Sequence, residues 1–188
     1  SQAVGMLDAW GDHPAVRQTL DEASAALGQD LASLIHNGPK EDLALTTNTQ
    51  PVMLVAGVAA YRAWRAEGGQ APAVVAGHSL GEYAALVAAE VLTLADAVPL
   101  VRLRAQAMQE AVPVGQGAMA AILGLTSAQV IEGCTQAQAS FGADSTEVVD
   151  AANFNDPAQT VIAGSKAAVD KACELLKGMG AKRALPMP

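Results

Sequence analysis

The chain has 188 residues, of which 51% are hydrophobic and 16% charged, with a formal net charge of −8 at pH 7. This length allows one or two hydrophobic cores. An acidic chain with so few aromatic side chains lacks the basic surface and the stacking rings of a nucleic-acid-binding protein. No apolar run approaches the roughly 18 residues of a membrane helix, and the first residues do not resemble a signal peptide. We therefore expect a cytoplasmic protein that contacts neither nucleic acid nor membrane.

The first part of the chain is expected to be mostly helical. Apolar residues recur at helical spacing, and Gly follows two of the runs. One short apolar segment is typical of a buried parallel strand, which needs neighbouring strands to pair with. No other segment before residue 115 has this character, so the predicted sheet is incomplete. The predicted helices cover residues 14–27, 50–66, 80–91 and 94–110, and the predicted strand covers 73–77.

The second part alternates differently. We expect strands over 118–125, 148–154, 160–163 and 182–185, and helices over 127–139 and 166–179. The order β-α-β-β-α-β is that of a split βαβ, or ferredoxin-like, unit. The sequence therefore predicts an α/β protein with two subdomains, residues 1–116 and a complete ferredoxin-like unit over 117–188. Cys134 and Cys173 fall in its helices without C-x-x-C spacing, so we expect free thiols and no metal site.

The most informative motif joins the predicted strand to the following helix. Gly77-His78-Ser79-Leu80-Gly81 has the G-x-S-x-G pattern of a nucleophile elbow, which indicates an incomplete α/β-hydrolase-like parallel sheet in the first subdomain. Ser79 would sit in a strained turn, and Gly77 and Gly81 are expected because a Cβ at either position would collide with the backbone. The Leu80 N–H would face the oxyanion. The alternative is a Ser that merely caps the helix.

A nucleophilic Ser needs a base within hydrogen-bonding reach. His78 is next to Ser79 and should point to the opposite face. His13 and His36 lie in polar stretches. We expect all three to be structural, and the base to lie outside this chain.

Four further motifs extend the pattern along nearly the whole chain. They are Gln50-Pro51-Val52-Met53, an R-x-x-x-M-Q helix from Arg104 to Gln109, a G-x-M-A-A-I-x-G strand over 117–124, and an N-x-N-x-P-x-Q-x-V-I-x-G hairpin over 153–164. Together with G-H-S-L-G-E at 77–82, they resemble the malonyl-CoA:acyl carrier protein transacylases of bacterial fatty acid biosynthesis and the related acyltransferase domains of polyketide synthases.

The resemblance implies an acyltransferase that moves a malonyl group from malonyl-CoA to the phosphopantetheine thiol of acyl carrier protein through a Ser79 acyl-enzyme. Arg104 would hold the malonyl carboxylate, for which a guanidinium is well suited. Met108 would line the acyl pocket, and His78 and Asn153 would contact substrate. Ser79 and Arg104 should then lie within reach of each other. The competing interpretations are a core Met108 and a turn-forming Asn153, while Arg102 is expected to be exposed to solvent.

The resemblance further implies a missing first strand and a general-base His just beyond residue 188. We therefore expect a fragment of an enzyme that is monomeric at full length and uses no cofactor, since the CoA thioester is a substrate. Two alternatives stay open at this point. One is a serine hydrolase or esterase with the same elbow, and the other is a non-catalytic fragment that binds carrier protein or CoA.

Overall fold

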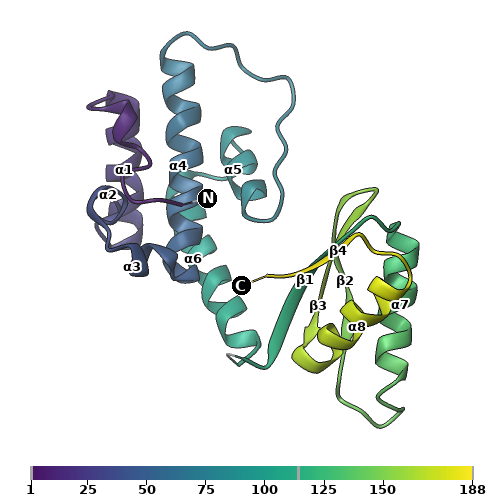
Figure 1. Ribbon diagram of the computed structural model, residues 1–188. Coiled ribbons are helices and arrows are strands. Elements are labelled where there is room, and N and C mark those ends of the chain that lie inside the picture. Colours follow the sequence, from purple (N-terminus) through teal and green to yellow (C-terminus); the bar gives the residue numbers. More distant parts are fainter. Residues whose placement is uncertain (1, 114, 188) are drawn as a thin grey trace. The chain divides into compact units, whose positions relative to one another are not determined.

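The computed structural model describes residues 2–113 and 115–187 and has a mixed α/β fold (Figure 1). The chain divides into two compact units between Ala111 and Val112. We call these unit 1 and unit 2. The boundary expected from the sequence, after residue 116, lies slightly further along the chain.

All the regular secondary structure among the described residues of unit 1 is helical. It contains a 3-10 turn η1 (Asp8–Trp10) and the helices α1 (Pro14–Leu27), α2 (Leu31–Asn37), α3 (Lys40–Ala44), α4 (Thr46–Ala66), α5 (Leu80–Ala88) and α6 (Leu94–Ala111). The bounds of α1 are those predicted, because Pro14 occupies its first turn and Gly28 ends it in the left-handed conformation. Helix α4 begins earlier than predicted and α5 ends earlier, while α2 and α3 are additions.

The core of unit 1 is built around α4, which packs against α1, α5 and α6 (Figure 1). Its buried face includes Val52, Val55 and Val58, which pack in one cluster with Val98 and Val101 of α6. The long helices α4 and α6 therefore form a rigid base from which residues of the candidate site project.

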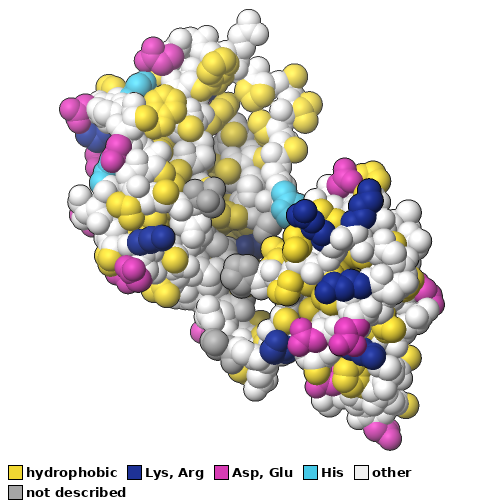
Figure 2. Space-filling view, viewed as in Figure 1, with side chains coloured by type: hydrophobic (Ala, Val, Ile, Leu, Met, Phe, Trp, Pro, Cys, Tyr) yellow, Lys and Arg dark blue, Asp and Glu magenta, His cyan; other side chains and the backbone are white. Residues whose placement is uncertain are grey.

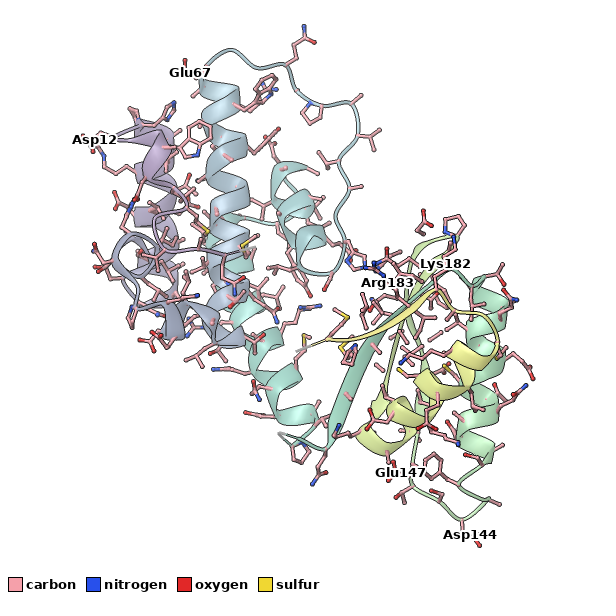
Figure 3. The ribbon with its side chains drawn as sticks, viewed as in Figure 1. Asp12, Glu67, Asp144, Glu147, Lys182 and Arg183 are labelled. Atoms are coloured by element: carbon pink, nitrogen blue, oxygen red, sulfur yellow. The ribbon has the colours of Figure 1, made fainter. Side chains whose placement is uncertain are left out.

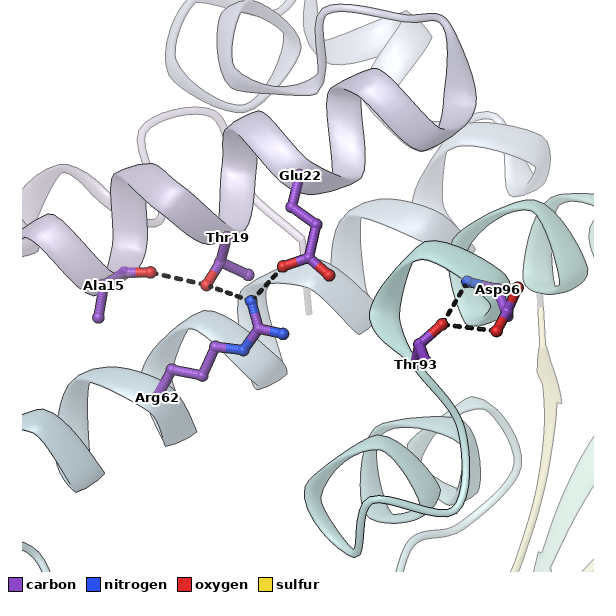
Figure 4. A network of polar contacts seen from close by, with 6 residues as sticks. All are labelled: Ala15, Thr19, Glu22, Arg62, Thr93 and Asp96. Atoms are coloured by element: carbon purple, nitrogen blue, oxygen red, sulfur yellow. Dashed lines mark hydrogen bonds and ion pairs between the residues drawn. The ribbon is translucent and has the colours of Figure 1, made fainter.

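Polar contacts fix the helices of unit 1 (Figure 4). Arg62 of α4 donates from Nη1 to Glu22 Oε2 at 2.6 Å and to Thr19 Oγ1 at 3.3 Å, both on α1. Before α6, the Thr93 hydroxyl accepts from the Asp96 N–H at 3.1 Å and donates to the Asp96 carboxylate at 2.6 Å. This arrangement caps the start of α6.

The predicted strand over 73–77 is not formed. The segment runs without regular secondary structure from the turn after α4 to α5, and Val74 is 83% exposed. The physical reason is that no other strand exists among the described residues of unit 1 to pair with it. The prediction of a strand at this place is therefore wrong for the structure as it stands.

Unit 2 contains a four-stranded antiparallel sheet. Its elements are β1 (Gly117–Leu123), α7 (Ser127–Ala139), β2 (Val149–Asp156), β3 (Gln159–Ser165), α8 (Lys166–Gly178) and β4 (Arg183–Met187), and the strand order is β2-β3-β1-β4. Strand β1 lies in the middle, with Ala120 opposite Ile162 on one side and Pro186 on the other. The β-α-β-β-α-β element order is the one predicted.

Helices α7 and α8 cover one face of this sheet (Figure 1). Thr126 and Gln129 form a capping box at the start of α7, and this explains why its bounds match the prediction. The buried residues of the two helices are on the expected faces, with Cys134 buried and Cys173 partly buried in the same core. Both thiols are free. Burial raises the pKa of Cys134 to about 11, with smaller contributions from Asp150 and Cys173.

Most of the charged residues of unit 2 lie in three places: the loop after α7, the start of β4, and helix α8. Figure 3 shows Asp144 and Glu147 in the loop between α7 and β2, and Lys182 and Arg183 where β4 begins. On α8, Lys166 and Lys171 are paired with Asp170 and Glu174 at 3.2 and 3.5 Å. Such exposed pairs contribute at most about 1 kcal/mol each. These two lysines therefore belong to an ordinary charged helix face.

Figure 2 shows apolar side chains exposed on both units. The exposed large apolar residues of unit 1 include Val74, Leu103 and Met108. Within the described ranges, no helix combines the length and the apolar character needed to cross a membrane.

Candidate active site

Ser79 has the backbone geometry of a nucleophile elbow. It precedes α5 with φ 53° and ψ −116°, and turn hydrogen bonds on either side join Gly81 N–H to His78 O at 2.9 Å and Glu82 N–H to Ser79 O at 3.2 Å. A residue with a side chain at such a positive φ stores strain of about 1–3 kcal/mol. Its side chain makes no capping hydrogen bond to α5. The alternative of a simple capping Ser therefore does not hold.

The two glycines of the motif differ. A Cβ on Gly77 would overlap the carbonyl group of Gly81 and the amide nitrogen of Glu82. A Cβ on Gly81 would meet no described atom within 4 Å, so the collision expected at that position is not found. The reason is that Gly81 presents its backbone, not its Cα hydrogens, to Gly77. Only Gly77 is sterically required by the described residues.

Arg104 lies beside the nucleophile, as expected. Its Nη2 donates to Ser79 Oγ at 3.0 Å, and its Nη1 donates to Gln50 Oε1 at 2.6 Å. The guanidinium carbon also lies 5.8 Å from the centre of the Tyr83 ring, which is close enough for a cation–π contact. The side chain is half-buried. Helices α4, α5 and α6 thus bring a cation and a Ser hydroxyl together.

Gln50 is a site residue to which the sequence analysis gave no role. It is only 6% exposed, and its Nε2 lies 3.4 Å from Thr46 Oγ1 and 3.5 Å from Met108 Sδ. A polar residue at the start of an apolar helical run was the available signal. Its partner Arg104 is 54 positions away, however, and spacing along the chain does not indicate such a contact.

Met108 and Leu80 complete the immediate surroundings. Met108 is 53% exposed, so the interpretation as a core methionine is wrong, because its side of α6 is not covered by other described residues. The Leu80 N–H is the first of α5, and no hydrogen-bond acceptor for it is found in the described part of the chain. It therefore remains available to an external oxygen.

The histidines have different surroundings. His13 caps α1, where its Nδ1 accepts from the Ala15 N–H at 3.2 Å, and its Nε2 pairs with Glu67 at 3.1 Å. His36 pairs with Asp8. These contacts give both residues structural roles. His78 is exposed, and none of the hydrogen bonds found among the described residues involves its ring.

Arg102 differs from its expectation. It is half-buried, and its Nη2 donates to Gln29 Oε1 and, at 3.1 Å, to Asn48 Oδ1. Burial lowers the pKa of its guanidinium. The prediction of a solvent-exposed Arg102 is wrong because this face of α6 packs against Gln29, just after α1, and Asn48, in the first turn of α4. Arg102 and Arg104 therefore project from different faces of the same helix.

Asn153 belongs to unit 2. It is half-buried on β2 opposite Val161, next to a register shift in the β2–β3 pairing. The hairpin expected from the sequence is present. A contact of Asn153 with substrate stays a prediction. Among the described residues, no group of three or more His, Cys, Asp or Glu side chains is arranged to hold a metal ion.

Comparison with protein families gives a match to the acyl transferase domain over residues 1–185. The chain belongs to the acyl transferase domain family. Across the whole chain, it is 54% identical to the malonyl CoA-acyl carrier protein transacylase of Escherichia coli strain K12. It spans 59% of the length of that relative.

Solved structures of the same family agree with the fold. An acyl-carrier-protein S-malonyltransferase from Burkholderia pseudomallei 1710b matches all of this chain and 59% of its own, with a TM-score of 0.92 and 62% identity. A malonyl transacylase in complex with its type II polyketide synthase acyl carrier protein matches 99% of this chain and 59% of its own, with a TM-score of 0.90 and 48% identity. Similarity to this acyl transferase family therefore extends over both units.

Proposed function

We propose that this chain carries the nucleophile and the carboxylate-binding residue of an enzyme that transfers a malonyl group from CoA to the phosphopantetheine thiol of an acyl carrier protein, in fatty acid biosynthesis. The observation that carries the proposal is the 3.0 Å contact between Arg104 Nη2 and Ser79 Oγ. An esterase for neutral substrates gains nothing from a half-buried cation at its nucleophile, whereas a dicarboxylic acyl group requires one.

The reaction proceeds in two transfers. Ser79 Oγ attacks the thioester carbonyl carbon, a C–O bond forms, the C–S bond breaks, and CoA leaves as a thiol with the proton that the hydroxyl lost. The carrier thiol then attacks the carbonyl carbon of the Ser79 ester, a C–S bond forms, the C–O bond to Ser79 breaks, and Oγ takes up the proton that the thiol lost. In both steps the Leu80 N–H at the start of α5 stabilises the oxyanion.

Arg104 selects the acyl group. A malonyl ester on Ser79 carries its free carboxylate one methylene beyond the ester carbonyl, which is within reach of a guanidinium that already touches Oγ. Two parallel hydrogen bonds to the carboxylate would hold the group in place. An acetyl group would leave the cation unpaired in the loaded site, at a cost in binding. Met108, beside Gln50, would line the acyl pocket, and His78 and Asn153 would add contacts to substrate.

The proposal places the general base outside these 188 residues. His13 and His36 are engaged in structural contacts, and His78 directly precedes Ser79 in the chain, where its side chain is exposed. No resident cofactor takes part, because the CoA thioester is itself a substrate. We further propose that the full-length enzyme is a monomer and that it is cytoplasmic. The two free thiols of this chain support the second point, because disulfides are rare in reducing compartments.

We also propose a subdomain type for each of the two units. We infer that unit 2 is a ferredoxin-like subdomain, which its strand order β2-β3-β1-β4 supports. Unit 1 would be part of an α/β-hydrolase-like subdomain in which residues 73–77 pair with strands from outside this chain. A hollow of about 430 Å³ between residues 75–77 and α5 is consistent with such a neighbour.

Acylation of Ser79 tests the function. Full-length enzyme mixed with malonyl-CoA should gain one malonyl mass on the peptide that contains Ser79, and Ser79→Ala should gain none, because its side chain has no nucleophile. Intact-protein and peptide mass spectrometry measure both. Labelling that persists in Ser79→Ala, or wild-type enzyme that transfers nothing to a carrier-protein thiol, would overturn the proposal.

A further inference from the structure

Two arginines on α6 are each held by a glutamine, but only one faces the nucleophile. Arg104 bonds to Gln50 and to Ser79, whereas Arg102 bonds to Gln29 and Asn48. The Gln50 side chain is nearly fully buried, so its amide is expected to have a specific purpose.

The contacts of Gln50 fix the direction of its amide. A guanidinium only donates hydrogen bonds, so the Gln50 oxygen must face Arg104. The amide nitrogen then faces Thr46 Oγ1 and Met108 Sδ, and a thioether sulfur only accepts. The reversed amide would set donor against donor at Arg104. Gln50 therefore holds the guanidinium in one orientation, with Nη2 on Ser79.

Gln50, which accepts a hydrogen bond from Arg104, carries no charge. Elsewhere in unit 1, Arg62 is held by the carboxylate of Glu22, which compensates its charge. A carboxylate at position 50 would do the same to Arg104. An amide oxygen fixes the guanidinium but leaves its positive charge uncompensated, so this charge remains available to an incoming anion.

We propose that Gln50 is the positioning residue that sets acyl selectivity, because it aims Arg104 at the Ser79 ester without neutralising it. This proposal rests on the proposed function. The ligand class that it selects is an acyl thioester with a free carboxylate close to the carbonyl, as opposed to a neutral acyl thioester of similar size.

The test is Gln50→Glu in the full-length enzyme, a change that keeps the shape of the side chain and adds a negative charge. The matched control is Gln29→Glu, which makes the same change beside Arg102. The measurement is the ratio of kcat/KM for malonyl-CoA to that for acetyl-CoA. Gln50→Glu should lower this ratio at least about thirtyfold, which corresponds to about 2 kcal/mol. The fall should come from a lower kcat/KM for malonyl-CoA. Gln29→Glu should leave it unchanged.

A second variant and a binding measurement complete the test. Gln50→Met removes the acceptor without adding charge, so it should raise KM for malonyl-CoA more than KM for acetyl-CoA. In the Ser79→Ala background, calorimetry should show the same loss of malonyl-CoA affinity for Gln50→Glu without turnover. Thermal melting identifies any variant that does not fold, and Gln50→Met decides the question if Gln50→Glu is such a variant.

The outcomes separate the two proposals. If wild-type enzyme acylates Ser79 but Gln50→Glu keeps the wild-type ratio, or lowers malonyl and acetyl transfer equally, the role of Gln50 is overturned and the proposed function stands. An equal fall of the ratio in Gln29→Glu would also overturn it, since the effect would then not depend on Arg104. If wild-type enzyme does not acylate Ser79, both proposals fail.

Discussion

At the scale of single residues, the site depends on a backbone conformation that the chain adopts at a cost. Ser79 has a positive φ although it carries a side chain, and this strain must be offset by the packing of its neighbours. Gly77 makes the turn possible, because the backbone of Gly81 and Glu82 fills the space in which its Cβ would stand. The exposed hydroxyl of Ser79 is the result.

The two glycines of the elbow provide a direct comparison. Gly77→Ala should abolish acylation of Ser79 in the full-length enzyme. It should also lower the free energy of unfolding by about 1–3 kcal/mol or more, which is typical when atoms are forced into an occupied space. Gly81→Ala should have a much smaller effect on the free energy of unfolding of the 188-residue chain, since no described atom lies near its Cβ position. Chemical denaturation and malonyl labelling measure the two effects. Equal effects of the two substitutions would show that the steric account of the elbow is wrong.

The sequence predicted these residues unevenly. Ser79 and Gly77 belong to a short local motif, and the proximity of Arg104 to Ser79 was expected from the family resemblance and is confirmed by their hydrogen bond. Gln50 was given no role, and the expectation of an exposed Arg102 was wrong. Their environments depend on contacts between residues more than 50 positions apart, and helical periodicity carries no information about such contacts.

At the scale of elements, features fixed by neighbouring residues were predicted correctly, whereas a feature that needs a distant partner was not. The bounds of α1 and α7 follow from their own caps, so the sequence was sufficient to place them. The short helices α2 and α3 carry too few turns for a clear period. The segment 73–77 has the composition of a strand, but a strand exists only when another one supplies its hydrogen bonds.

This requirement gives a prediction for residues 73–77. In the 188-residue chain their amide hydrogens should exchange with solvent rapidly, because the backbone is unpaired. In the full-length enzyme the same amides should be protected, because neighbouring strands would accept their hydrogen bonds. Hydrogen exchange read by mass spectrometry on both proteins tests this, with the amides of β1 as an internal reference. Rapid exchange in the full-length enzyme would contradict the proposed parallel sheet.

At the scale of the whole molecule, the two units differ in whether their predicted strands find partners within the unit. Unit 2 has a four-stranded sheet, two covering helices and a core of its own, with Ile122, Ile162 and Leu176 fully buried. Unit 1 has a helical core of its own, but its segment 73–77 finds no strand to pair with among the described residues. Both units expose large apolar side chains, such as Val74 in unit 1 and Phe154 in unit 2.

Unit 2 should therefore fold alone. A protein of residues 112–188 is expected to show a single cooperative thermal transition and the circular dichroism of a mixed α/β fold, because its core residues all come from within this range. Leu176→Ala should lower the free energy of unfolding by about 2–5 kcal/mol, since it leaves a cavity in the core. A chain without a cooperative transition would show that unit 2 depends on the rest of the protein.

The central claim is that Arg104 and Ser79 form one site for a carboxylate-bearing acyl group. The most direct measurement compares malonyl and acetyl transfer by full-length wild-type enzyme, Arg104→Ala and the control Arg102→Ala, which alters the neighbouring arginine on another face of α6. Arg104→Ala should lower kcat/KM for malonyl-CoA about a hundredfold, the effect of removing one partner of a buried charged pair, and leave acetyl-CoA unchanged or improved. Arg102→Ala should leave the malonyl-to-acetyl ratio as in the wild type. Equal losses of malonyl and acetyl transfer in Arg104→Ala would contradict the account.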